Sequence, residues 1–192
     1  DMKKSFNLIL LVVCSFVYSQ EELKDKLPYY EVPEYAEEFT AGTMAARMVD
    51  ALGFRYYWAS KDLNEKDLAY RLNEKGRSTA ETINHIYELS IIIVNSTLQK
   101  PNSRGDKVEM TYKEKRTTTL NNLKKASDIL HVSNDISQFK IIFGEQKIPF
   151  WNQINGPIAD AIWHCGQIAV YRRVTKNPIN PKVNHFTGKI RN

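Results

Sequence analysis

Cysteine is scarce in this sequence, which excludes a fold that depends on disulfide bonds. Of the 192 residues only Cys14 and Cys165 are cysteines, and Cys14 lies in a segment that we expect to be removed. One remaining cysteine forms no intrachain disulfide. Cys165 has small and apolar neighbours, so we interpret it as a packed structural thiol rather than as a nucleophile.

The sequence also lacks the features of a nucleic-acid-binding protein. The formal net charge is +5 at pH 7, but the lysines and arginines are scattered, with no basic stripe and no recognition motif. We find no internal repeat and no low-complexity tract. The content of 42% hydrophobic and 26% charged residues is typical of a globular protein. The length predicts one domain with a full hydrophobic core. The scattered positive charge predicts no nucleic-acid partner.

Long hydrophobic runs are missing as well. The longest run, at residues 6–13 and broken only by Asn7, is too short to span a bilayer. It follows two lysines and precedes small or branched residues at 17–19, an order that predicts a signal peptide at 1–19. Val13 is bulkier than the residue that normally precedes a lipidated cysteine, so we favour cleavage after position 19 over a lipoprotein anchored at Cys14. We therefore expect an exported protein, periplasmic or secreted, with no stable membrane span.

Helical periodicity dominates the remaining sequence, after a polar N-terminal arm at 20–35. Four helices are predicted, at about residues 36–60, 78–98, 112–130 and 157–176. The second has the clearest start, because Ser78 and Glu81 have the spacing of a capping box. A single helical turn or a plain turn is expected at 64–72. The fold class is therefore all-α, a four-helix bundle over residues 36–175, followed by an irregular tail at 176–192.

The connection between the third and fourth helices is long for a helical bundle. Residues 139–143 and 147–151 are rich in apolar and aromatic side chains and flank Gly144, which is consistent with a small β-hairpin. Pro149 would confine the second arm to a sheet edge. Loops of this length often cover a functional site.

Four polar residues share one narrow stripe of the last predicted helix: Asp160, His164, Gln167 and Tyr171. They follow each other at i, i+4, i+7 and i+11. The flanking residues are apolar or small: Ile158, Trp163 and Val170 on one side, Ala161 and Ile168 on the other. We therefore expect the stripe in the middle of the buried face, with Cys165 and Arg172 pointing elsewhere. Buried polar groups cost stability unless they have partners, so the stripe either forms internal hydrogen bonds or binds a ligand.

His85 is the second candidate site residue, at the edge of the apolar face of the helix at 78–98. A single histidine in such a position is usually a satisfied core residue. However, Asp160 and His164 form a second polar group, and their i, i+4 spacing lets both reach one metal ion. We predict that His85 faces His164 across the core. The expected ligands are His85, Asp160 and His164, and the expected ion is zinc, with manganese, iron or nickel as alternatives.

Two stretches of the sequence resemble the DinB/YfiT-like superfamily. They are Thr-Ile-Asn-His-Ile-Tyr-Glu-Leu at 82–89, after a capping box, and His-Cys-Gly-Gln at 164–167, followed by Tyr-Arg-Arg. The resemblance implies a four-helix bundle, often with a divalent metal on one histidine of the second helix and two histidines of the fourth. His85 matches the first ligand and His164 the last, while Asp160 stands where the family has the other histidine.

Two functional hypotheses are open, one catalytic and one non-catalytic. Known members include thiol-dependent transferases and isomerases, but their thiols are cytoplasmic, which argues against that chemistry in an exported protein. The first hypothesis is a metal-dependent hydrolase or thiol transferase for a small molecule, with Gln167 and Tyr171 orienting ligands or contacting substrate. The second is a non-catalytic bundle, binding a small ligand or purely structural, with an internally hydrogen-bonded polar core. A homodimer is compatible with either.

Overall fold

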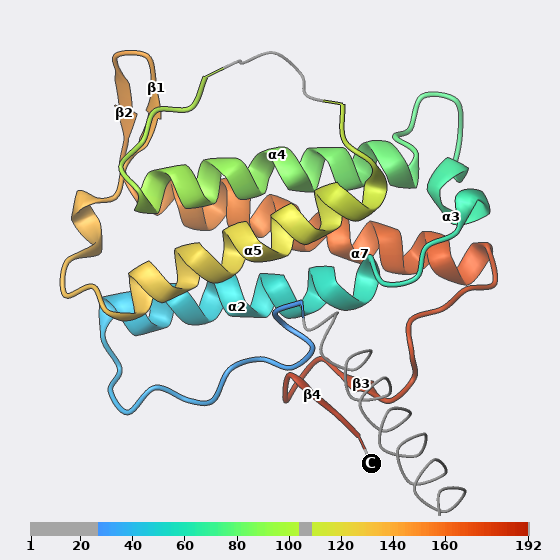
Figure 1. The fold of residues 1–192 in the computed structure, drawn as a ribbon, viewed down its shortest axis with the longest axis horizontal. Helices are drawn as coiled ribbons and strands as arrows, with labels where there is room; N and C mark the ends of the chain where they lie inside the picture. Colours follow the sequence, from blue (N-terminus) through green and yellow to red (C-terminus); the bar gives the residue numbers. More distant parts are fainter. Residues whose placement is uncertain (1–26, 104–108, 192) are drawn as a thin grey trace, which may run out of the picture.

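The protein is mainly helical, with a few small strands (Figure 1). The computed structural model describes residues 27–103 and 109–191. The predicted signal peptide, its cleavage site and Cys14 lie outside these residues. The four long helices lie side by side: α2 (Ala41–Ala59), α4 (Thr79–Thr97), α5 (Tyr112–His131) and α7 (Ala159–Val174). Among the helices of the described residues, none has the length and apolar character that a membrane crossing requires.

Side-chain caps determine where the first three long helices begin. Ser78 and Glu81 form the predicted capping box, with Ser78 N donating to Glu81 Oε2 at 2.6 Å and Glu81 N donating to Ser78 Oγ at 3.1 Å. The hydrogen bonds that Ser78 makes to the Glu81 carboxyl, chiefly from its backbone amide, lower the pKa of that carboxyl below its ordinary value. The helix predicted from residue 36 begins instead at Ala41, because Thr40 caps it. A threonine that satisfies the first free amides ends the preceding irregular segment there.

Helix α5 packs against both α2 and α4, and α7 packs against the same two helices. The core between them is apolar, and its largest fully buried side chains include Leu52, Phe54, Ile86, Leu123 and Ile168. The short helix α3 (Glu65–Ala69) occupies the connection between α2 and α4, as predicted for residues 64–72. Residues of the predicted N-terminal arm also join the core, since Tyr29 is buried and donates its hydroxyl to Asp50 at 3.1 Å.

The predicted hairpin is present between α5 and α7. A 3-10 turn at Ile136–Gln138 precedes it, and strands β1 (Ile141–Phe143) and β2 (Gln146–Ile148) then pair antiparallel. Gly144 takes a positive φ of 57° in the turn, which glycine adopts without strain. The amide of Asn102 donates to the carbonyl of Ile142 at 2.8 Å and holds the hairpin against the end of α4.

The start of the last helix differs from the prediction. A helical turn α6 (Trp151–Gln153) and a π-helical segment η2 (Ile154–Ile158) precede α7, so the helical region begins six residues before Pro157. Pro157 has no amide proton and its ring crowds the preceding turn. The chain accommodates it with a kink at Gly156, whose ψ is −108°. The kink ends directly before α7 and thereby sets the direction in which Asp160 projects.

The buried face of α7 is not the predicted one. The buried residues of this helix are Ala161, His164, Cys165, Ile168 and Arg172. The centre of that face is therefore one residue, or about 100° of rotation, away from the predicted stripe. Trp163 is 74% exposed and Val170 is also exposed, so the prediction that both flank a buried stripe is wrong. The polar stripe lies instead along the rim of the packed face.

Two residues that were predicted to point away from the stripe lie inside the protein. Cys165 is buried as a packed thiol, as predicted from its neighbours, and burial raises its pKa to about 12. The buried Arg172 donates Nη1 to the carbonyls of Trp58 at 2.9 Å and Lys61 at 2.8 Å. It also donates Nε to the carbonyl of Asn177 at 2.7 Å. One guanidinium group thus satisfies the free carbonyls at the end of α2 and joins that end to α7.

The C-terminal tail is more regular than predicted. Strands β3 (Val183–Asn184) and β4 (Lys189–Ile190) form a second small antiparallel sheet. The carbonyl of Gly188 accepts a hydrogen bond from the amide of Val32 at 2.9 Å. Lys189 pairs with Glu34 at 2.6 Å. These contacts attach the tail to the segment that precedes α2.

Candidate metal centre

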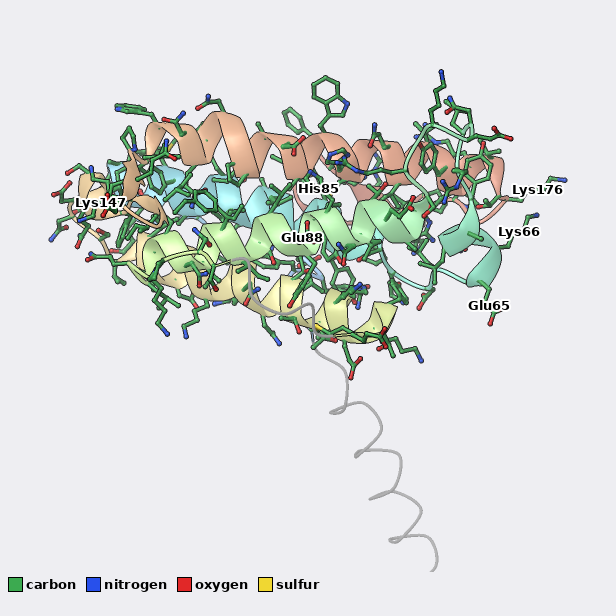
Figure 2. All side chains as sticks on the ribbon, turned by 90° about the horizontal axis from the view of Figure 1, so that it is seen from above. Glu65, Lys66, His85, Glu88, Lys147 and Lys176 are labelled. Atoms are coloured by element: carbon green, nitrogen blue, oxygen red, sulfur yellow. The ribbon has the colours of Figure 1, made fainter. Side chains whose placement is uncertain are left out.

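The predicted meeting of His85 and His164 is present in the structure. The cap at Ser78 sets the start of α4, and seven residues later His85 lies on the side of the helix that faces α7 (Figure 2). Its ring centroid is 4.8 Å from that of His164, with the rings nearly perpendicular at 83°. Two histidines that are far apart in the sequence are thus brought together by the packing of α4 against α7.

Asp160 lies between the two histidines and contacts both. Its Oδ2 is 2.9 Å from Nε2 of His85, and its Oδ1 is 3.3 Å from Nε2 of His164. One ligand-type atom from each of the three residues lies within 4.8 Å of the others. The residues His85, Asp160 and His164 therefore form a group, called the triad below, that could hold a metal ion.

The triad is open to solvent on one side. The side chains of His85 and Asp160 are 24% and 41% exposed, whereas that of His164 is 11% exposed. The rim position of the stripe on α7 explains the difference between Asp160 and His164, since His164 is the one of the two that belongs to the buried face of α7. An ion at the triad would therefore be reachable by water or by a small molecule, which a fully buried polar stripe would not allow.

Gln167 holds the ring of His164 from the next turn of α7. Its Oε1 lies 2.6 Å from Nδ1 of His164, so Nδ1–H donates to the amide oxygen. The lone pair of the neutral ring is then on Nε2, the nitrogen that faces Asp160. Metal-binding histidines commonly have their other ring nitrogen hydrogen-bonded in this way.

Tyr171, the last residue of the predicted stripe, lies away from the triad. It is seven residues, about two helical turns, beyond His164. Its ring packs edge-on against Tyr70 beside α3, with a centroid distance of 5.2 Å. The structure thus brings together four of the five predicted site residues and gives Tyr171 a packing contact instead.

Arg77 is a site residue that sequence reasoning missed. It directly precedes the cap of α4, and its Nη1 lies 3.5 Å from Nε2 of His164. No periodicity identifies such a position, because a residue before a cap lies outside the helix. Its proximity to Ser78, the best-defined helix start in the sequence, is the one signal that could have drawn attention to it.

Two open grooves of about 690 Å³ each meet at the triad. The first is polar and is lined by residues that include Arg71, Glu74, Lys75, Arg77, His85 and Lys115. The second is mainly apolar and is lined by residues that include Leu89, Ile92, Phe143, Ile148, Asp160 and Trp163. His85 belongs to one groove and Asp160 to the other, and these two side chains are in contact. The triad therefore lies at the junction of a charged surface and an apolar one.

Comparison with known proteins finds no match: no family model, no curated protein and no solved structure matches this chain. The resemblance to the DinB/YfiT-like superfamily stays a prediction from the motifs around His85 and His164.

Proposed function

We propose that this protein is an exported, DinB-like four-helix bundle that binds one divalent cation and acts as a metal-dependent hydrolase on a small molecule. The observation that carries the proposal is the convergence of ligand-type atoms from His85, Asp160 and His164 within 4.8 Å. The three groups come from two separate helices, and the packing of α4 against α7 brings them together.

The donor set fits a catalytic metal centre. Two histidine nitrogens and one carboxylate oxygen are three protein ligands, which is the number in catalytic zinc sites that keep a fourth position open. The same set also suits manganese, iron or nickel, since supply and geometry decide among them. The partial exposure of His85 and Asp160 leaves the open position accessible. We therefore favour zinc, with those three ions as alternatives.

A bound divalent ion would supply a water molecule whose pKa is lowered towards neutrality, and so a nucleophile for hydrolysis. The residues of this chain have separate tasks around the ion. His85, Asp160 and His164 hold the ion, and Gln167 keeps Nε2 of His164 free to bind by accepting the proton of Nδ1. We favour hydrolysis over thiol transfer because an exported protein does not meet the cytoplasmic thiols of those transferases.

A non-catalytic bundle with an internal polar network is the second candidate function. The observation in its favour is that Asp160 accepts from His85 at 2.9 Å, while Arg77 approaches His164 at 3.5 Å. These contacts satisfy the triad without an ion. In that case the protein would bind a small ligand, or act as a structural component, without metal chemistry.

Metal analysis of untagged protein, together with melting curves in the presence and absence of a chelator, distinguishes the metal-dependent hydrolase from the non-catalytic bundle. We expect about one divalent ion per chain, lost in His164→Ala and bound more weakly in Asp160→Asn, which keeps an oxygen but no charge. At a hundredfold excess over Kd, the ion stabilises the folded state by about 2.7 kcal/mol, or roughly 5–10 °C in Tm.

The control is His131→Ala, an exposed histidine at the end of α5. It should retain both the ion and the response to chelator. Absence of stoichiometric metal, with the same Tm in chelator, would contradict the proposal and favour the internal network.

A further inference from the structure

Arg77 is the positively charged side chain that contacts the triad. It is exposed, and its Nη1 is 3.5 Å from Nε2 of His164. The nearby Arg71 is already occupied, since it pairs with Glu81 at 3.4 Å and donates to the carbonyl of Gly76. Among the described residues Arg77 has no carboxylate partner within ion-pair distance. Its guanidinium group is thus available, beside the candidate metal centre, to bind a planar anion.

The remainder of the polar groove limits the charge of that anion. Glu74, Glu81 and Glu88 line the groove together with Arg71, Lys75, Arg77 and Lys115. Figure 2 shows Glu88 on the same helix as His85, one turn further along. Three carboxylates beside four cations disfavour a polyanion such as a nucleic acid. They are compatible with a single negative charge placed at Arg77.

The apolar groove on the other side of the triad exposes large side chains. Trp163 of α7 is 74% exposed and Phe143 of β1 is 43% exposed. Its apolar lining also includes Leu89 and Ile92 of α4 and Ile148 of β2. Covering such surfaces with an apolar group gains about 25 cal/mol for each Å² removed from water. A volume of about 690 Å³ is in the range of small-molecule sites.

From these two surfaces we infer that the substrate is a small amphipathic carboxylate. Its carboxylate binds Arg77, and its apolar part lies in the groove between the β1–β2 hairpin and Trp163, so that the bond to be hydrolysed lies at the triad. This inference rests on the proposed metal-dependent function. An amine of the same shape is disfavoured, because both Arg77 and a bound cation repel it.

The test measures binding of octanoate to the zinc-loaded protein by isothermal titration calorimetry. Acetate lacks the apolar part, and octylamine carries the opposite charge. We expect octanoate to bind at least about tenfold more tightly than acetate, a difference of about 1.4 kcal/mol, and octylamine not to bind. Arg77→Gln and Trp163→Ala should each weaken octanoate binding severalfold. Both side chains are exposed, so the variants should fold, which circular dichroism verifies.

Matched controls are Lys75→Gln, which removes a charge from the same polar groove, and Val170→Ala, which removes an exposed apolar side chain of α7 outside the apolar groove. Neither should change octanoate binding. Equal binding of octanoate and octylamine, or unchanged binding in Arg77→Gln, would overturn the inference and leave the metal-dependent function standing. A protein that fails to bind zinc at all would overturn both the inference and the proposed function, and a zinc titration carried out before the octanoate measurement distinguishes these outcomes.

Discussion

Replacing Arg77 by glutamine removes the positive charge nearest to the proposed metal ligands, and it should strengthen metal binding. Nη1 of Arg77 lies 3.5 Å from Nε2 of His164, so a cation on Nε2 repels the guanidinium group. At a separation of about 5 Å in water, a charge of two and a charge of one repel by about 1.7 kcal/mol. The aqueous value applies because Arg77 is exposed. We therefore expect Arg77→Gln to bind zinc roughly tenfold more tightly than the unmodified chain.

Competition against a chromophoric zinc chelator measures this affinity directly. The advantage of Arg77→Gln should be largest at low ionic strength and should shrink towards 1 M salt, where the Debye length falls to about 3 Å. Lys75→Gln is the control, since it makes the same charge change in the same groove. It lacks the contact with His164, so its zinc affinity should stay close to that of the unmodified chain.

Equal zinc affinities for Arg77→Gln and the unmodified chain would refute the reasoning, because the charge at Arg77 would then not act on the ion. So would a gain that is independent of salt. A large loss of stability in Arg77→Gln, without zinc binding by either protein, would show instead that Arg77 is a structural partner of His164 in an internal network.

Three further predictions concern the fold. Arg172→Met should destabilise the protein by about 3–5 kcal/mol in urea unfolding, because buried carbonyls at the end of α2 lose their donor. Gly42→Ala should lower the free energy of unfolding by more than about 2 kcal/mol, since the added Cβ would lie 2.4 Å from a backbone carbonyl oxygen of α5. At Gly166 an added Cβ meets nothing within 4 Å, so Gly166→Ala should stabilise α7 by about 0.5–1 kcal/mol. Burial raises the pKa of Asp50 above its ordinary value of 3.8. The folded state therefore holds this proton more tightly than the unfolded state, and the free energy of unfolding falls as the pH rises from 3.8 through the raised pKa. Asp50→Asn keeps an acceptor for Tyr29 and should raise Tm at pH 7 but not below pH 3.8, as melting curves across that range would show.

Local signals in the sequence were sufficient for much of the fold. The start of α4 follows from Ser78 and Glu81, because a capping box involves only residues three positions apart. The hairpin follows from two short apolar runs around Gly144, and the pairing of Asp160 with His164 follows from one turn of helix. Each of these features is a short-range interaction, so neighbouring residues specify it. The predicted start of the last helix was wrong, because the chain accommodates Pro157 by a kink within a longer helical region. The residues around Pro157 do not by themselves indicate that kink.

The triad depends both on the local sequence and on the tertiary structure. Its members were identified from residue type, spacing and the resemblance of two short motifs, but the contact between His85 and Asp160 spans 75 positions of sequence. Only the packing of α4 against α7 creates it. The tertiary structure also decided which side of α7 is buried. Where small, polar and apolar side chains alternate, the amphipathic pattern leaves the buried face uncertain by one residue. The positions of α2 and α4 select the face with Cys165 and Arg172. The tertiary structure likewise placed Arg77 at His164, since a residue outside any helix has no periodic position and is located only by the tertiary structure around it.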